Sequence, residues 1–227
     1  MNVCLIPARG GSKRIPRKNI RDFCGKPMIG WSIDAAQRAR CFDRIIVSTD
    51  DPEIAELALR LGVEAPFTRP AELSDDHATT VDVVRHALNW LADESEMPEN
   101  LCCLYATAPF VLAEDILAGA QVIRHWSFAV PVTTFPFPVQ RAVKITDAGG
   151  LQMFDPDQYT TRSQDLEEAY HDAGQFYWGR SAAWLDGTSP FGADTHPIIL
   201  PRWRVQDIDT PEDWSRAEAM FQVLGLG

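Results

Sequence analysis

The sequence predicts an α/β fold in which a Rossmann-like, mainly parallel sheet carries helices on both faces. Up to residue 132, short apolar runs alternate with segments of helical periodicity, as in successive βαβ units. The 227 residues are enough to bury one full core, which favours a single domain over residues 1–227. The alternation stops at about residues 134–173, where prolines, glycines and short alternating segments predict an inserted β-rich arm.

Strands are expected where a few apolar or β-branched residues are bounded by turn signals. These runs are residues 3–6, 44–48, 63–67, 101–105 and 128–132. The aromatic run at residues 176–178 is expected to return to the same sheet after the arm. Ligands of such sheets lie beyond the carboxyl ends of the strands, so the segments that follow these runs are candidate site residues.

Helices are expected where apolar residues recur at helical spacing between a start signal and a stop signal. These segments are residues 27–40, 52–61, 80–92, 113–125 and 211–224. Pro27 suits a first helical turn, and Gly62 stops the second helix. Either Thr79 or Thr80 is expected to cap the third helix.

The loop that follows the first expected strand is strongly basic. Between Arg9 and Lys26 it holds seven basic residues and one acidic residue, although the chain has a net charge of −11. Gly10 and Gly11 allow backbone N–H groups to approach an anion, and the basic side chains supply counter-charge. The spacing matches neither common glycine-rich nucleotide fingerprint. A solvated basic turn is the alternative, but this spacing directly after a strand favours a triphosphate cradle.

The composition narrows the class of protein. An acidic chain lacks the broad basic face that nucleic-acid binding needs, so a small anionic ligand is expected instead. The apolar runs are far shorter than the roughly 20 residues of a membrane span, and the N-terminal run is too short for a signal peptide. The five cysteines lack metal-ligand spacing and are expected to be reduced thiols of a cytoplasmic protein. Neither a nucleic-acid partner nor a membrane partner is expected.

Two motifs in the basic loop resemble a known family signature. They are IPARGGSK at residues 6–13 and PRKN at residues 16–19. Further resembling segments follow in the family's order: GKPMI at 25–29, VSTD at 47–50, RPAELSDD at 69–76 and QDIDTPED at 206–213. The chain therefore resembles the acylneuraminate cytidylyltransferase family over nearly its whole length. Members of that family activate eight- or nine-carbon keto-sugar acids with CTP.

The resemblance implies a CTP site in and around the basic loop. Its expected members are Ala8, Arg9, Gly10, Gly11, Ser12, Lys13, Lys18, Asn19, Arg69 and Thr80. The positions of Arg69 and Thr80 read cytosine in relatives, and a guanidinium or a hydroxyl can meet the acceptors of that base. A loop salt bridge for Arg69 and a helix cap for Thr80 are the alternatives. Asn19 is expected near the ribose or the α-phosphate.

Asp207 and Asp209 form the candidate metal site. They lie two residues apart on an expected extended segment, so their carboxylates face one side and suit a shared Mg²⁺. Acids that favour the start of a helix are the alternative, which explains Glu212 and Asp213 but not Asp207. Mg²⁺ is the expected cofactor. The expected catalytic residues are Arg9, Lys13, Lys18, Asp207 and Asp209.

Three segments depart from the commoner family pattern and resemble the branch that activates pseudaminic acid. They are YATAPF at residues 105–110, TRSQDLE at 161–167 and YHDAGQFYW at 170–178. The implied sugar-binding residues are Tyr105, Thr107, Arg162, His171, Gln175, Phe176 and Tyr177. Aromatic side chains suit the acyl methyl groups of this sugar, with plain core packing as the alternative. Arg162 is a candidate partner of the sugar carboxylate, and Arg141 and Lys144 are alternatives.

The resemblance implies that the anomeric hydroxyl of the sugar acid attacks the α-phosphorus of CTP and that pyrophosphate leaves. The expected product is a CMP-activated sugar for bacterial surface glycans or flagellin. N-acetylneuraminate, legionaminate and Kdo are alternative substrates, and a non-catalytic nucleotide- or sugar-binding regulator is the alternative from another class. The arm and the resemblance together predict a homodimer.

Overall fold

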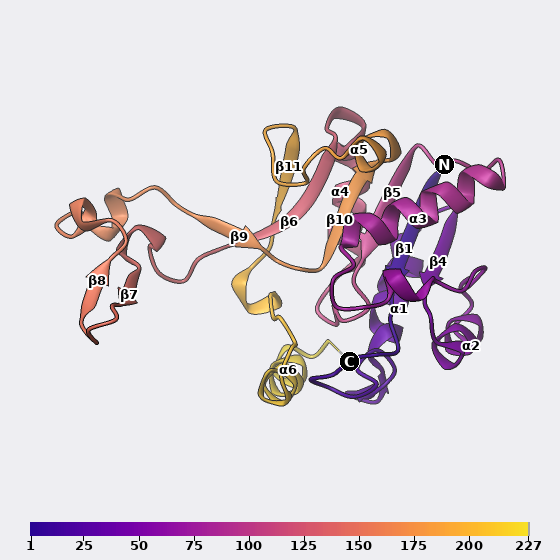
Figure 1. Cartoon of the computed structure of the whole chain (residues 1–227), viewed down its shortest axis with the longest axis horizontal. Helices are drawn as coiled ribbons and strands as arrows, with labels where there is room; N and C mark the ends of the chain where they lie inside the picture. The colour runs from indigo at the N-terminus through magenta and orange to yellow at the C-terminus, as the bar shows by residue number, and fades with distance from the viewer. Residues whose placement is uncertain (227) are drawn as a thin grey trace.

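A seven-stranded sheet forms the centre of the molecule (Figure 1), in a computed structural model that describes residues 1–226. In spatial order its strands are β11 (Thr195–Ile199), β6 (Phe128–Thr134), β10 (Phe176–Arg180), β5 (Asn100–Leu104), β1 (Asn2–Pro7) and β4 (Arg44–Ser48), with β9 (Tyr170–Asp172) paired to β6. β1 runs parallel to β4 and β5, and β11 runs parallel to β6. β10 is antiparallel to both of its neighbours. The predicted mainly parallel α/β sheet is confirmed.

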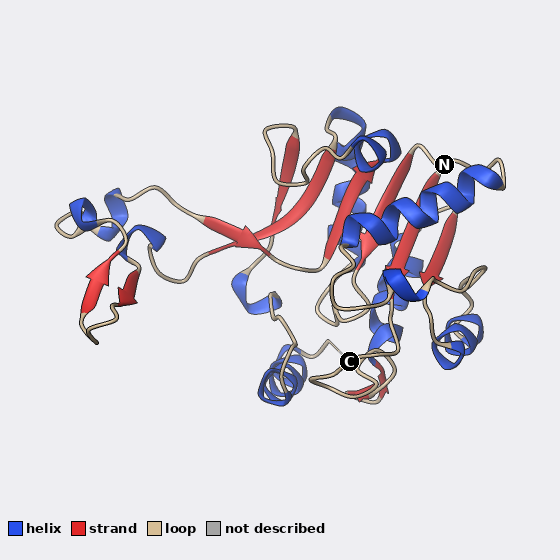
Figure 2. Ribbon diagram, in the orientation of Figure 1, coloured by secondary structure: helices blue, strands red, loops and turns tan. Residues whose placement is uncertain are grey.

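Helices cover both faces of this sheet (Figure 2). They are α1 (Met28–Ala39), α2 (Pro52–Arg60), α3 (Thr80–Asp93), α4 (Ala113–Val122) and α5 (Ser181–Asp186), whereas α6 (Pro211–Leu224) packs in a separate apolar cluster. Cys4 of β1 packs in one apolar cluster with Ile33 of α1. The neighbouring Leu5 packs in another cluster with Leu88 of α3 and Trp184 of α5, because successive strand residues point to opposite faces. None of the helices within residues 1–226 has both the length and the apolar composition needed to cross a membrane.

A third apolar cluster joins the two ends of the chain. The N-terminal part is a short hairpin of β2 (Asp22–Phe23) and β3 (Lys26–Pro27). The Phe23 ring makes edge contacts with Trp214 and Phe221 of α6, at centroid distances of 5.4 and 5.3 Å. This packing holds the segment before α6 against the basic loop that follows β1, although the two are about 190 residues apart in sequence.

An arm projects from the sheet between β6 and β9 (Figure 1). It contains the hairpin of β7 (Val143–Ile145) and β8 (Leu151–Met153) and the 3-10 helices η3 (Val139–Arg141), η4 (Pro156–Gln158) and η5 (Ser163–Asp165). β9 returns antiparallel to β6, so these two strands form the base of the arm. The side chains of Ile145 and Leu151 are 78% and 75% exposed. The arm therefore presents apolar surface away from the core.

Two predicted elements differ in the structure. Residues 63–67 form no continuous strand in the described chain, because Glu64 and Thr68 make only single bridges, to Ile46 and Thr49. Pro66 lies between these bridges and has no N–H to donate to a continuous ladder. The predicted helix at 113–125 ends as an α-helix with α4, and its last turn is the 3-10 helix η2 (Ile123–His125).

Candidate active site

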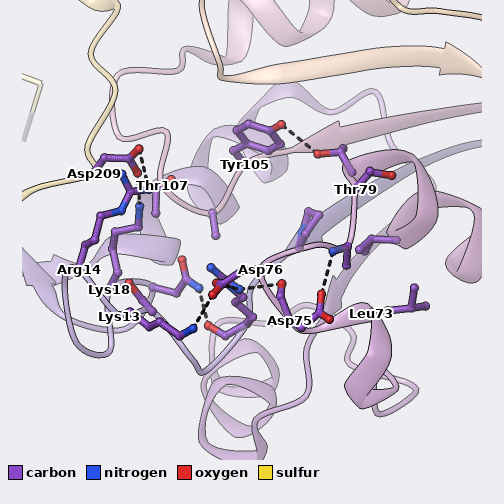
Figure 3. A pocket seen from close by; sticks show the side chains of 18 of the residues that line it. Lys13, Arg14, Lys18, Leu73, Asp75, Asp76, Thr79, Tyr105, Thr107 and Asp209 are labelled. Carbon is purple, nitrogen blue, oxygen red and sulfur yellow. Dashed lines mark hydrogen bonds and ion pairs between the residues drawn. The ribbon is translucent and has the colours of Figure 1, made fainter.

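A cavity of about 650 Å³ lies beyond the carboxyl ends of β1 and β5 (Figure 3). This is the edge of the sheet at which such α/β folds bind ligands. From the basic loop it is lined by Arg9, Ser12, Lys13, Arg14, Lys18 and Asn19. The other lining residues include Arg69, Asp75, Asp76, Thr79, Thr80, Tyr105, Thr107, Asp207 and Asp209. The cavity thus places concentrated positive charge beside acidic and hydroxyl groups.

The basic loop is held by the acids that follow β4. The N–H of Gly10 donates to Asp50 Oδ1 at 3.0 Å, and the Arg17 guanidinium donates to Asp51. A Cβ at position 10 would collide with the Asp51 carboxylate, so glycine is required there. Asp51 also caps α2 by accepting two N–H groups of its first turn. These hydrogen bonds, that from Arg17 foremost, lower the pKa of Asp51.

Two cations of the loop converge on the carboxylate of Asp76 (Figure 3). Arg9 Nη1 lies 2.7 Å from Asp76 Oδ1, and Lys13 Nζ lies 2.5 Å from Oδ2. Hydrogen bonds from Lys13 and Arg9 lower the pKa of Asp76 to about 2. The two carboxylate oxygens therefore stand between cations that would equally suit the oxygens of a phosphate.

Two further cations converge on Asp209. Arg14 Nη2 lies 2.8 Å from one carboxylate oxygen, and Lys18 Nζ lies 3.3 Å from the other. Lys18 also donates to the backbone oxygen of Ile208 at 2.7 Å. The basic loop and the acidic motif near the C-terminus therefore meet directly in the cavity. Each of the four cations is paired with an acid that an anionic ligand can replace.

Asp207 and Asp209 both line the cavity, on the segment between β11 and α6. Burial, followed by the charge of Asp209, raises the pKa of Asp207. A bound cation would relieve this repulsion, and carboxylate oxygens are ligands that Mg²⁺ prefers. Within residues 1–226, no group of three or more His, Cys, Asp or Glu side chains gathers as a metal site. The pair therefore fits a Mg²⁺ that also takes oxygens from a ligand or from water.

Arg69 reaches the cavity from the loop that follows the Thr68 bridge. Its side chain is 3% exposed, and its Nε donates to Ser74 Oγ at 3.0 Å. Burial is the main cause that lowers the pKa of Arg69. Its Nη2 lies 3.9 Å from Asp50 Oδ1, which makes the loop salt bridge a long one. A buried guanidinium with so weak an ion pair is suited to donate to an acceptor edge of a ligand.

Thr80 stands at the first position of α3. The helix cap is Thr79, whose side chain forms a capping box with Asp82, so the alternative role of Thr80 as the cap is wrong. The Thr80 hydroxyl instead lies 3.0 Å from the Tyr105 hydroxyl. This places a pair of hydroxyls at the boundary of the cavity where β5 ends.

A second cavity, of about 920 Å³, adjoins the first, because Tyr105, Thr107 and Asp207 line both. Its other lining residues are His171, Asp172, Ala173, Gly174, Tyr177, Arg202, Val205, Gln206, Asp213, Arg216 and Met220. The Tyr177 hydroxyl donates to Asp172, and its ring packs edge-on against Tyr105 with centroids 5.4 Å apart. Mixed charged, hydroxyl and apolar walls suit a polyhydroxylated ligand that also has apolar groups.

Most of the predicted site residues meet at these cavities. Arg9, Ser12, Lys13, Lys18, Asn19, Arg69, Thr80, Asp207 and Asp209 line the first, His171 and Tyr177 line the second, and Tyr105 and Thr107 line both. Arg14, Asp76, Arg202 and Arg216 also line them, although the sequence motifs assign these four no role. Charge clustering in the loop was a usable signal for Arg14, and Asp76 lies in the family-like segment at 69–76. Arg202 and Arg216 are brought in by segments distant in sequence and had no such signal.

Three residues predicted to bind CTP do not line either cavity. They are Ala8, Gly10 and Gly11. Ala8 is buried, and its N–H donates to the backbone oxygen of Ser48. Since the N–H of Gly10 is already taken by Asp50, these two backbone donors serve the loop rather than a ligand.

Three residues predicted to bind the sugar also lie away from the cavities. Gln175 is buried and donates to the backbone oxygen of Arg204 at 2.7 Å. Phe176 is fully buried, in agreement with the core-packing alternative. Arg162 lies exposed on the arm, where its Nε donates to Asp165 at 2.8 Å. Gln175, Phe176 and Arg162 are close in sequence to His171 and Tyr177, but they do not line the second cavity with them.

The chain belongs to the cytidylyltransferase family, whose model matches residues 3–185. It is 47% identical over 225 residues to the pseudaminic acid cytidylyltransferase of Campylobacter jejuni subsp. jejuni serotype O:2, covering 98% of this chain and 97% of the relative. It is 30% identical to the CMP-N,N'-diacetyllegionaminic acid synthase of Legionella pneumophila subsp. pneumophila, covering 97% and 96%. The family resemblance seen in the sequence is confirmed.

A solved structure shows the same fold. The chain matches a CMP:2-keto-3-deoxy-manno-octonic acid synthetase complexed with CTP at a TM-score of 0.71, with 19% identity and coverage of 98% of this chain and 99% of that chain. The sheet and its surrounding helices are therefore an arrangement shared with a sugar-acid synthetase of much lower sequence similarity.

Proposed function

We propose that this cytidylyltransferase joins CTP and pseudaminic acid to give the CMP-activated sugar and pyrophosphate. The observation that carries the proposal is the pair of adjoining cavities that share Tyr105, Thr107 and Asp207. One cavity has the cations that a triphosphate needs, and the other is open to a second substrate beside it. The choice of sugar acid is supported by the relative that is 47% identical over nearly the full length of both chains.

In the proposed reaction, Arg9, Lys13 and Lys18 bind the triphosphate and neutralise the pyrophosphate as it leaves. The anomeric hydroxyl of the sugar acid forms a bond to the α-phosphorus, the bond to the β-phosphate breaks, and the hydroxyl proton passes to solvent. Phosphate oxygens would take the place of the Asp76 and Asp209 carboxylates as partners of these cations. The reaction then depends on positioning and charge neutralisation and needs no covalent protein intermediate.

Asp207 and Asp209 would hold Mg²⁺ in this proposal. When bound, Mg²⁺ supplies charge neutralisation at phosphate oxygens and lowers the pKa of a hydroxyl that it contacts. Once the triphosphate has taken Lys18 and Arg14, the Asp209 carboxylate is released from its ion pairs and is available as a ligand.

The remaining proposed roles are those that the family resemblance implies, and their residues line the two cavities. Arg69 and Thr80 recognise the cytosine, and Asn19 lies towards the ribose and the α-phosphate. Tyr105 and Thr107 stand between the two substrates, while His171 and Tyr177 contact the sugar.

We further propose that the single domain, residues 1–227, forms a homodimer through the arm at about residues 134–173. The large apolar side chains of Ile145, Leu151 and Phe154 are exposed on this arm, which is the property expected of a surface that a second copy covers. We place the reaction in the cytoplasm, because CTP is supplied there.

The proposed function is tested by measuring the release of pyrophosphate from CTP in the presence of Mg²⁺ and each of four sugar acids. Pseudaminate is expected to react fastest, compared with N-acetylneuraminate, legionaminate and Kdo. A faster reaction with one of the other three acids would move the substrate assignment to that acid. Release with none of the four, in a protein that still binds CTP, would favour the non-catalytic regulator.

A further inference from the structure

Arg202 lines the second cavity, and its positive charge has no carboxylate partner among the described residues. It begins the 3-10 helix η6 (Arg202–Arg204), which lies between β11 and the acidic motif, and it lines the cavity. Within residues 1–226 its guanidinium has no carboxylate partner, and its hydrogen bond there is a long one, 3.5 Å from Nη1 to the backbone oxygen of Phe135. One N–H group of the guanidinium, on Nη1, therefore has a protein acceptor, and the other N–H groups can donate to a ligand.

The neighbouring arginines are neutralised. Arg216, which lines the same cavity, has its Nη2 3.2 Å from Asp213 Oδ1. Arg204 is buried and forms two hydrogen bonds to the carboxylate of Asp115. Among the described residues, Arg202 is therefore the arginine of this cavity that lacks a counter-charge.

A keto-sugar acid carries its carboxylate on the anomeric carbon, the same carbon whose hydroxyl must face the α-phosphate. The carboxylate must therefore lie near the junction of the two cavities or in the second cavity. The acids Asp172, Asp207 and Asp213 line that cavity and would repel it. A guanidinium offers two parallel N–H donors that match a carboxylate, which makes Arg202 the fitting partner.

Phe135 connects Arg202 to His171 on the cavity. Phe135, whose backbone oxygen holds the guanidinium, packs its ring edge-on against the His171 imidazole with centroids 4.8 Å apart. His171 Nδ1 lies 2.8 Å from the backbone oxygen of Asp172, and His171 lines the same cavity. Phe135 thus contacts both Arg202 and His171, two residues that line this cavity from segments separate in sequence.

We propose that Arg202 binds the carboxylate of the sugar acid and so orients the anomeric hydroxyl towards the nucleotide. The inference rests on the proposed function. It adds a candidate to the sequence-based ones, Arg162, Arg141 and Lys144, which lie on the arm and do not line the cavity within this chain.

Steady-state kinetics of Arg202→Gln provides the test. The KM for the sugar acid is expected to rise about 10- to 100-fold, as for loss of a charge-assisted hydrogen-bonded pair, with the KM for CTP within about two-fold. Arg202→Lys, which keeps the charge but not the fork, is expected to recover part of the loss. Arg60→Gln, an exposed arginine on α2, is the matched control and is expected to behave as the wild type.

A substrate analogue makes the test specific for the carboxylate. The wild type is expected to discriminate strongly against the carboxamide of the sugar acid, and Arg202→Gln is expected to lose most of this discrimination. An unchanged sugar KM in Arg202→Gln, or the same rise in KM in Arg162→Gln instead, would overturn the assignment. Calorimetric binding of the sugar acid separates the two proposals, because Arg202-dependent binding without turnover would reject the reaction and keep the carboxylate site.

Discussion

Asp76 is the residue that most directly competes with the proposed nucleotide. Its carboxylate joins Arg9 and Lys13, two of the residues proposed to bind the triphosphate. Because the Asp76 side chain is open to solvent, these ion pairs are screened and readily exchanged. The pairing keeps the two cations oriented towards the cavity before the ligand arrives.

The Asp76→Asn variant is expected to bind CTP more tightly, by about two- to five-fold, because the nucleotide no longer displaces a carboxylate. Calorimetric titration of CTP in the absence of the sugar acid measures the change. Asp75→Asn is not a matched control, since Asp75 caps the turn that carries Asp76. The exposed Asp147→Asn on the arm is a suitable one. Weaker CTP binding by Asp76→Asn would show that this carboxylate assists the nucleotide.

A second prediction concerns the proposed metal ligands, Asp207 and Asp209. Asp207→Ala combined with Asp209→Ala is expected to reduce Mg²⁺-dependent pyrophosphate release by about 100-fold or more, since the charge of the transition state is left without its counter-ion. Removal of Mg²⁺ by EDTA is expected to have the same effect on the wild type. Glu212→Gln, an exposed neighbour, serves as the control. Release at a nearly normal rate in the double variant would contradict the metal assignment.

At the scale of elements, the junction of β4 with α2 positions the basic loop. Asp51 caps α2 and accepts from Arg17, so one carboxylate couples the start of a helix to the loop. Arg17 itself has a φ of 57°, in the left-handed region, and the ion pair helps to hold it there. Loop geometry in this fold therefore depends on a helix cap outside the loop.

The Asp51–Arg17 pair is expected to make stability depend on pH. The pKa of Asp51 is lowered in the folded protein from its ordinary 3.8, so the pair stabilises the fold above that value and this stabilisation is lost as the pH falls through the lowered value. Arg17→Gln is expected to lower Tm by about 2–4 °C at pH 7, with a difference that shrinks by pH 3. Thermal unfolding across this range measures it, and a constant difference in Tm would contradict the pH linkage.

Element types were more predictable than strand direction. Local periodicity identified β1, β4, β5 and the long helices, because each pattern is complete within one segment. The antiparallel direction of β10 was not predictable, since an aromatic run buried on both faces reads the same either way. β11 was missed because it contains Pro197, which argues against a strand but is tolerated at the edge of the sheet.

At the scale of the whole molecule, the arm supports a prediction about assembly. Ile145→Glu combined with Leu151→Glu is expected to convert the proposed dimer into a monomer, because charges would enter an apolar contact surface. Light scattering coupled to size exclusion measures the mass. Val223→Glu, on the equally exposed face of α6, is the control and is expected to remain dimeric. A wild-type protein that stays monomeric at every concentration would contradict the dimer.

The candidate site was predicted in part from the sequence. Arg9, Lys13 and Lys18 were identifiable because a basic loop directly after a strand is a local pattern. Arg162 was predicted to bind the sugar carboxylate from its position in a family segment; the structure places it exposed on the arm, and its role stays a prediction. Arg202 carried no local signal, since a single arginine in a short 3-10 helix has no distinctive pattern.

The sequence by itself determined the alternation of strands and helices, the basic loop, the acidic motif and the family. Each of these is recognised from a local pattern of residues close together in the chain. Only the tertiary structure decided that the loop and the motif meet, through Lys18 and Ile208 about 190 residues apart. It also decided which cations are paired with acids and that Arg202 lines the second cavity without a carboxylate partner among the described residues. These outcomes depend on how the sheet and α6 pack, and no local pattern encodes contacts between segments so distant in the chain.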